Sequence, residues 1–133
     1  MNLYFFRNKK IKEYYAVKTG LRNNNFIYRT NKGTFLVRVG KHHESNLKYE
    51  KSIYELLSDF KITPKFYGYE EIEEQEFIIL EFVEGVHPSK ELSPKEQHWL
   101  IQILKKFHTI ENPNYKFLES EKEYIKNTYS NVE

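Results

Sequence analysis

The sequence predicts an α+β fold, in which a five-stranded antiparallel sheet with one helix is followed by a purely helical segment. Short strand-like runs occur between residues 12 and 39 and again between residues 65 and 83, separated by Asn, Gly and charged breaks. One amphipathic helical pattern lies between these two groups, and only helical patterns follow residue 93. The order β-β-β-α-β-β and then helices favours a layered α+β protein.

Three strands are expected before the first helix, at residues 12–18, 26–30 and 34–39. Each is rich in β-branched or aromatic residues, and Thr19-Gly20 ends the first one. Asn31-Lys32-Gly33 separates the second from the third. A short connection containing Asn and Gly between two such runs predicts a hairpin.

The pattern changes period between Glu44 and Phe60, where apolar residues fall mostly three and four apart. This spacing predicts an amphipathic helix, and Pro64 ends it because the residue before a proline is disfavoured in helices. A strand is expected at 65–69, and the Glu-rich stretch Glu70–Glu76 is interpreted as a turn. The run 77–83 is the most apolar of the chain, which favours a buried central strand.

A second helix is expected at 94–110, because its start carries a complete set of helix signals. Ser93 stands at the N-cap, Pro94 at the first helical position, and Glu96 three residues after the cap completes a capping box. A weaker final helix is expected at 118–129.

Composition excludes several classes of function. The 133 residues fit about one domain, and 17 % aromatic residues indicate a folded chain. A net charge of +2 gives no basis for a nucleic-acid or anionic-membrane partner. The absence of cysteine excludes disulfides, thiolate zinc sites and cysteine nucleophiles. Since the apolar run at the N-terminus is too short for a signal peptide and no span of about 20 apolar residues occurs, a cytoplasmic protein is expected.

Five segments, in order along the chain, resemble the aminoglycoside phosphotransferase and choline/ethanolamine kinase family, which has a protein-kinase-like fold. The loop Thr19–Phe26 resembles the Gly-Gly-Leu/Met-Thr/Ser-Asn-x-Asn-Phe/Tyr loop of these kinases. The other matches are the strand Phe35–Gly40, Glu50 twelve residues after Arg38, the linker Phe82–Gly85, and Leu104–His108. The resemblance implies the small lobe of that fold, followed by the first helices of a large lobe.

The resemblance implies that ATP binds to this lobe. Its cofactor-binding residues are then Gly20, Arg22, Asn23, Asn25, Arg38, Glu50, Glu81 and Val83. Glycine and amide side chains suit a turn that approaches phosphates, and a strand cation held by a helix glutamate is an ion pair that kinases require. We expect the base pocket to be floored by Val37 and Ile79 or by their sheet neighbours. Thr19 and Arg22 depart from the family pattern, which leaves the nucleotide affinity open.

The catalytic groups of the family are missing from this sequence. Family members use a His-x-Asp-x-x-x-x-Asn loop and a later metal-binding Asp, whereas Asp59 is the only Asp here. We therefore expect no catalytic residue and no metal ligand in this chain, and Mg²⁺ only if a large lobe is supplied. On this interpretation residues 1–86 are the nucleotide-binding lobe, and 87–133 are the linker and first helices of a truncated large lobe.

Two functions follow from this interpretation. The chain is either part of an ATP-dependent small-molecule kinase that is inactive alone, or a stand-alone non-catalytic module that binds nucleotide or a protein. The acceptor substrate is not encoded in this part of the family domain. Trp99, Ile103 and Phe107 form an apolar stripe on the second helix. Either a separate C-terminal lobe or a second copy binds helix 94–110 through this stripe, or the final helix covers it.

Overall fold

The computed structural model describes residues 2–18, 23–41, 46–86 and 91–111. The chain forms two compact units, Met1–Ser89 and Lys90–Glu133, and each is described by itself. The domain boundary expected after residue 86 stays a prediction.

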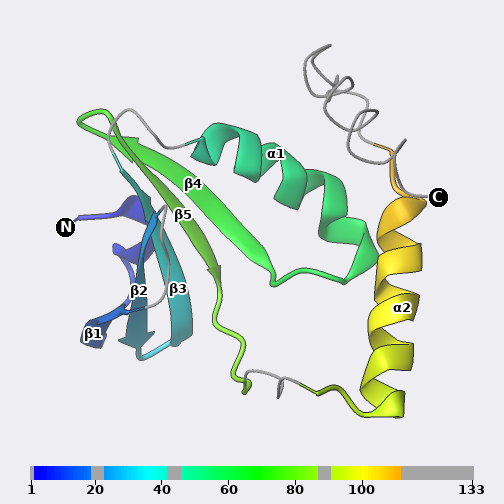
Figure 1. Ribbon diagram of the computed structural model, residues 1–133. Helices are drawn as coiled ribbons and strands as arrows, with labels where there is room; N and C mark the ends of the chain where they lie inside the picture. Colours follow the sequence, from blue (N-terminus) through cyan, green and yellow to red (C-terminus); the bar gives the residue numbers. More distant parts are fainter. Residues whose placement is uncertain (1, 19–22, 42–45, 87–90, 112–133) are drawn as a thin grey trace. The chain divides into compact units, whose positions relative to one another are not determined.

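The first unit is built on a five-stranded antiparallel sheet in the order β1-β2-β3-β5-β4 (Figure 1). Its strands are β1 (Ile11–Val17), β2 (Asn23–Thr30), β3 (Gly33–Gly40), β4 (Phe66–Ile72) and β5 (Gln75–Glu81). One helix, α1 (Leu47–Leu57), lies against the sheet and continues into the short 3₁₀ helix η2 (Ser58–Phe60). The predicted α+β fold with five antiparallel strands and one helix is confirmed.

The sheet has two apolar faces, because successive side chains of a strand point to opposite sides. The face that α1 covers is here called the helix face. There, Ile78 and Leu80 of the sheet form a cluster with Leu47 of α1, and the residues packed against this cluster are Leu36, Tyr54, Phe66 and Tyr69. The opposite face, called the outer face, carries Tyr28, Phe35, Val37, Val39, Phe77 and Ile79. Burial on both faces explains why β5 is apolar throughout its centre.

The N-terminal residues cover part of the outer face, which the sequence did not indicate. A 3₁₀ helix, η1 (Tyr4–Phe6), places Phe6 at 7 % exposure with its ring stacked on Tyr28 at a centroid distance of 5.0 Å. Glu70 of β4 fixes this helix, because its carboxylate accepts the backbone N–H groups of Tyr4 at 2.6 Å and Phe5 at 3.0 Å. The N-terminal segment is therefore part of the core.

The turn expected at Glu70–Glu76 is wrong for most of its length. Glu71 pairs with Glu76 and Ile72 with Gln75, so both strands extend through the Glu-rich stretch. Only Glu73 and Glu74 form the turn, with φ angles of 50° and 66°. Positive φ at both central residues matches the twist of a two-residue hairpin, although Asn and Gly adopt it at lower cost.

Strand β2 begins earlier than the sequence predicts. The expected strand started at Phe26, whereas the structure includes Asn23, Asn24 and Asn25 in β2, paired with Gly40, Val39 and Arg38 of β3. The ladder to a regular neighbouring strand outweighs the weak β propensity of asparagine. The first helix is also shorter than expected, since α1 and η2 together span residues 47–60 and residues 44–45 lie outside the described part.

The second unit contributes one described helix, α2 (Pro94–His108). Its predicted capping box is present: the Ser93 hydroxyl accepts the Glu96 N–H at 3.2 Å, and the Glu96 carboxylate accepts the Ser93 N–H at 2.7 Å. The final helix expected at 118–129 lies outside the described residues. Among the helices that the structure describes, none is long and apolar enough to cross a membrane.

Candidate functional site

An ion pair joins the sheet to α1 on the helix face. Arg38 lies in the middle of β3, between β2 and β5, and its Nη1 donates to Oε1 of Glu50 in the first turn of α1. Both side chains are 25 % exposed, so the pair is partly shielded and still reachable from solvent. The structure thus brings together the cation and the acid that the sequence singled out.

Asn25 contacts the same guanidinium from the neighbouring strand. It is the cross-strand partner of Arg38, and its Oδ1 accepts a hydrogen bond from Arg38 Nε at 3.0 Å. Directly opposed residues of an antiparallel pair have side chains on the same face, which explains the contact. The Arg38 side chain is therefore held at both its Nε and its Nη1 groups.

Tyr54 is the third group at the ion pair, and the sequence analysis missed it. It follows Glu50 by one helical turn, so both side chains project from one side of α1. Its ring stacks on Phe66 with a centroid distance of 5.9 Å and an interplanar angle of 7°. Its hydroxyl lies close enough to Arg38 and Glu50 to interact with both, and burial, against the opposing effect of Arg38, raises its pKa. The four-residue spacing after Glu50 was the signal that could have identified it.

The remaining predicted site residues lie at other places. Asn23 is half-buried in β2, on the same side of the strand as Asn25. Gly20 and Arg22 lie outside the described residues. Glu81 is bound to the start of β4, because its N–H donates to the Lys65 carbonyl at 2.8 Å and its carboxylate accepts the Lys65 N–H at 3.0 Å.

Val83 follows β5 in the linker and is 61 % exposed. The end of β5 is therefore fixed by Glu81, whereas residues 83–86 of the linker are exposed to solvent.

The base pocket was expected to be floored by Val37 and Ile79 or by their sheet neighbours, and the first two residues do not lie on the side of the sheet that carries Arg38. Both residues belong to the buried cluster of the outer face, because β3 alternates and Val37 points away from the side that Arg38 occupies. The apolar neighbours on the helix face are Leu36 of β3 and its cross-strand partner Ile27 of β2.

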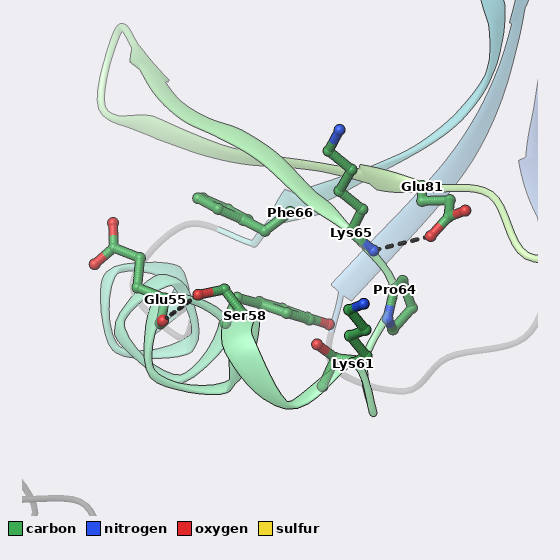
Figure 2. A pocket seen from close by; sticks show the side chains of 9 residues that line it. Glu55, Ser58, Lys61, Pro64, Lys65, Phe66 and Glu81 are labelled. Atoms are coloured by element: carbon green, nitrogen blue, oxygen red, sulfur yellow. Dashed lines mark hydrogen bonds between the residues drawn. The ribbon is translucent and has the colours of Figure 1, made fainter.

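A pocket of about 630 Å³ opens beside the ion pair, between the end of α1 and the start of β4 (Figure 2). Tyr54 and Phe66 contribute its aromatic wall. The other residues that line it are Glu55, Ser58, Lys61, Thr63, Pro64, Lys65 and Glu81. Tyr54 thus belongs both to this pocket and to the Arg38–Glu50 contact.

Metal-binding groups are not gathered anywhere in the described part of the chain, where no three His, Cys, Asp or Glu side chains form a cluster. Asp59, the one aspartate of the sequence, lies exposed in η2. The donor set that holds divalent cations, several oxygen ligands around one point, is therefore not found among these residues.

Comparison with known proteins gives one family. A model described as the phosphotransferase enzyme family matches residues 14–129, from β1 to beyond α2. A search of curated proteins found no significant match to this sequence.

Proposed function

We propose that this chain, which belongs to the phosphotransferase enzyme family, contributes the nucleotide-binding lobe of an ATP-dependent kinase that acts on a small alcohol. Family membership supports a transferase chemistry. The observation that carries the nucleotide part is the Arg38 guanidinium, which Glu50 and Asn25 hold on an accessible face of the sheet. The resemblance favours an acceptor of the choline, ethanolamine or aminoglycoside type.

The residues around Arg38 fit the phosphate end of ATP. Guanidinium is a planar, permanently charged donor suited to phosphate oxygens. Asn23 adds an amide on the same side of β2, and Gly20 and Arg22, which lie outside the described residues, precede it in the sequence. On the same face, the partly exposed side chain of Leu36, two residues before Arg38 in β3, offers apolar surface for a base. When bound, ATP supplies the phosphoryl group, and these residues orient it.

The residues present do not fit Mg²⁺ or the chemical step. The single aspartate is in η2, and the described residues form no carboxylate cluster. The sequence also contains no His-x-Asp-x-x-x-x-Asn loop to orient an acceptor hydroxyl. We therefore assign metal binding and catalysis to groups outside these 133 residues.

The described residues form no carboxylate cluster, and this also fits a second candidate, a non-catalytic module that binds nucleotide or a protein. The two candidates differ in their genetic context. A neighbouring reading frame that encodes His-x-Asp-x-x-x-x-Asn supports the kinase lobe, and a genome without one supports the module.

Replacing Arg38 by alanine is expected to weaken ATP binding at least about tenfold, since hydrogen bonds to charged groups contribute about 1.5–3 kcal/mol. Arg38→Lys should fall between wild type and alanine, because it keeps the charge and loses the planar fork. Isothermal titration calorimetry without Mg²⁺ measures both. Arg29→Ala is the matched control, because Arg29 forms an exposed strand ion pair with Glu13 at 2.9 Å. Equal ATP affinity of wild type and Arg38→Ala contradicts the proposal.

The isolated chain is expected to transfer no phosphate from ATP to choline, ethanolamine or an aminoglycoside above a control without protein. The reason is the missing base and metal ligands. A coupled ADP-release assay with Mg²⁺ tests it. Turnover that a single substitution in this chain abolishes shows that the catalytic groups are present after all.

The exposed apolar side chains of α2 support a partner for the second unit. Trp99, Leu100, Ile103, Leu104 and Phe107 are all more than one third exposed, along one side of the helix. We propose that a separate C-terminal lobe packs on this side, and that a second copy of the chain occupies it when no such lobe is supplied.

A further inference from the structure

We infer that Asn25 and Tyr54 are positioning residues, which hold the Arg38 guanidinium in the orientation that presents it to a ligand on the helix face. Neither role follows from the Arg38–Glu50 pair. The functional consequence rests on the proposed nucleotide binding, whereas the positioning itself can be tested without any ligand.

Asn25 acts on the Nε side of the guanidinium. Its Oδ1 accepts the Arg38 Nε–H at 3.0 Å, and the two residues face each other across the β2–β3 ladder. The amide oxygen of Asn25 thus fixes Arg38, whereas its NH2 group takes no part in this bond. Locking the Nε–H bond restricts the rotation of the guanidinium plane, and ordering it beforehand reduces the entropy lost on binding.

Tyr54 acts on the Glu50 side. The Tyr54 hydroxyl lies close to both charged groups, and its roles there are fixed by chemistry: it can only accept from the guanidinium of Arg38 and only donate to the carboxylate of Glu50. The stacked ring of Phe66 fixes the tyrosine from behind. Burial raises the pKa of the hydroxyl, which therefore keeps the proton that it donates at neutral pH.

The contacts of Asn25 and Tyr54 explain how an ion pair that is only partly buried can be held in one orientation. A single exposed Lys or Arg pair with a carboxylate contributes about 0–1 kcal/mol, because holding two long side chains costs entropy. Here, two further side chains interact with the pair, Asn25 from β2 and Tyr54 from α1. These added interactions offset the entropy lost when the pair is ordered. Arg38 thus enters the binding reaction already oriented.

The first experiment measures the Nε–H resonance of Arg38 by ¹H–¹⁵N NMR, assigned through its loss in Arg38→Lys. The wild-type signal should exchange with water at least about tenfold more slowly than in Asn25→Ala, because a hydrogen-bonded N–H is protected. Asn25→Asp keeps the acceptor oxygen and should retain the slow exchange. Asn24→Ala is the matched control, since Asn24 is the neighbouring strand residue, points to the other face and pairs with Val39. Unchanged exchange in Asn25→Ala overturns the role of Asn25.

The second experiment compares Tyr54→Phe with Tyr67→Phe in ATP titrations without Mg²⁺. Tyr54→Phe keeps the ring on Phe66 and loses the hydroxyl, so ATP affinity should fall about five- to tenfold with little change in unfolding temperature. Tyr67 packs against Phe5 and Phe35 on the outer face, and its variant should bind like wild type. Equal affinities of the two variants overturn the role of Tyr54.

The two experiments separate this inference from the proposed function. If wild type binds no ATP, nucleotide binding is wrong, and the Arg38 Nε–H exchange still decides whether Asn25 positions the guanidinium. In that case Tyr54 is tested by the same resonance, whose chemical shift should move in Tyr54→Phe and stay in Tyr67→Phe. An unmoved shift in Tyr54→Phe contradicts the inference.

Discussion

Replacing Phe6 by alanine is expected to lower the free energy of unfolding of the sheet unit by about 3–5 kcal/mol. Phe6 is 7 % exposed, stacks on Tyr28 and meets the rings of Phe5 at 5.1 Å and Phe35 at 5.8 Å. The truncation leaves a cavity on the outer face that the rigid strands cannot close. Because small domains have a total stability of about 5–15 kcal/mol, this one change removes a large part of it.

Urea titration followed by far-UV circular dichroism measures this effect. Fluorescence is less suitable, since the one tryptophan, Trp99, belongs to α2 of the other unit. Tyr4→Ala is the matched control, because Tyr4 lies in the same 3₁₀ helix at 68 % exposure and its loss should cost less than about 1 kcal/mol. Similar losses for Phe6→Ala and Tyr4→Ala contradict the packing of η1 on the sheet.

The sequence predicted the sheet and its helices well, because these elements have strong local signals. The Asn31–Gly33 hairpin, the apolar run of β5 and the capping box at Ser93 depend on neighbours in sequence and are confirmed. The prediction for the Glu-rich stretch was wrong because its structure depends on pairing between strands and not on local signals. Charged residues are unfavourable in an isolated strand, yet Glu71 and Glu76 continue the ladder because β4 and β5 are already paired.

The N-terminal cover could not be predicted, because it depends on a contact between distant residues. Glu70 accepts the N–H groups of Tyr4 and Phe5, about 65 positions earlier in the chain. A run of four apolar residues after Asn2 carries no periodicity long enough to show which surface it covers. The position of this segment is determined only by the outer face of the folded sheet, on which Leu3 and Phe6 pack.

The Arg38–Glu50 ion pair was predicted, whereas Tyr54 beside it was missed. The family resemblance singled out Arg38 and Glu50, and the structure pairs them. Tyr54 was missed because a tyrosine on an amphipathic helix is usually part of the core, although its spacing of four residues after Glu50 places it beside the predicted pair. Of the expected pocket floor, Val37 and Ile79 lie on the outer face and their sheet neighbours Leu36 and Ile78 on the helix face, because one position along a strand separates the two faces.

The second prediction concerns the exposed apolar side of α2. Trp99 is 55 % exposed and Phe107 36 % exposed, and Leu100, Ile103 and Leu104 lie on the same side of the helix. Single exposed apolar residues are common on protein surfaces, whereas a contiguous patch of several hundred Å² usually marks an interface. Gln102, a described polar residue of α2, lies on the other side of the helix.

Self-association through α2 is therefore expected, and Trp99→Glu and Phe107→Glu should each weaken it at least about a hundredfold, because a carboxylate must be desolvated in an apolar contact. Sedimentation velocity over a range of concentrations measures the association of wild type and variants. Gln102→Glu is the matched control, since it adds the same charge on the polar side of the same helix and should associate like wild type. A wild type that stays monomeric at high concentration, with Trp99 fluorescence typical of a buried indole, shows that residues of the same chain cover the stripe. A supplied C-terminal lobe that binds the wild type and not Trp99→Glu supports the kinase-lobe proposal, because that lobe then competes with self-association for the same side of α2.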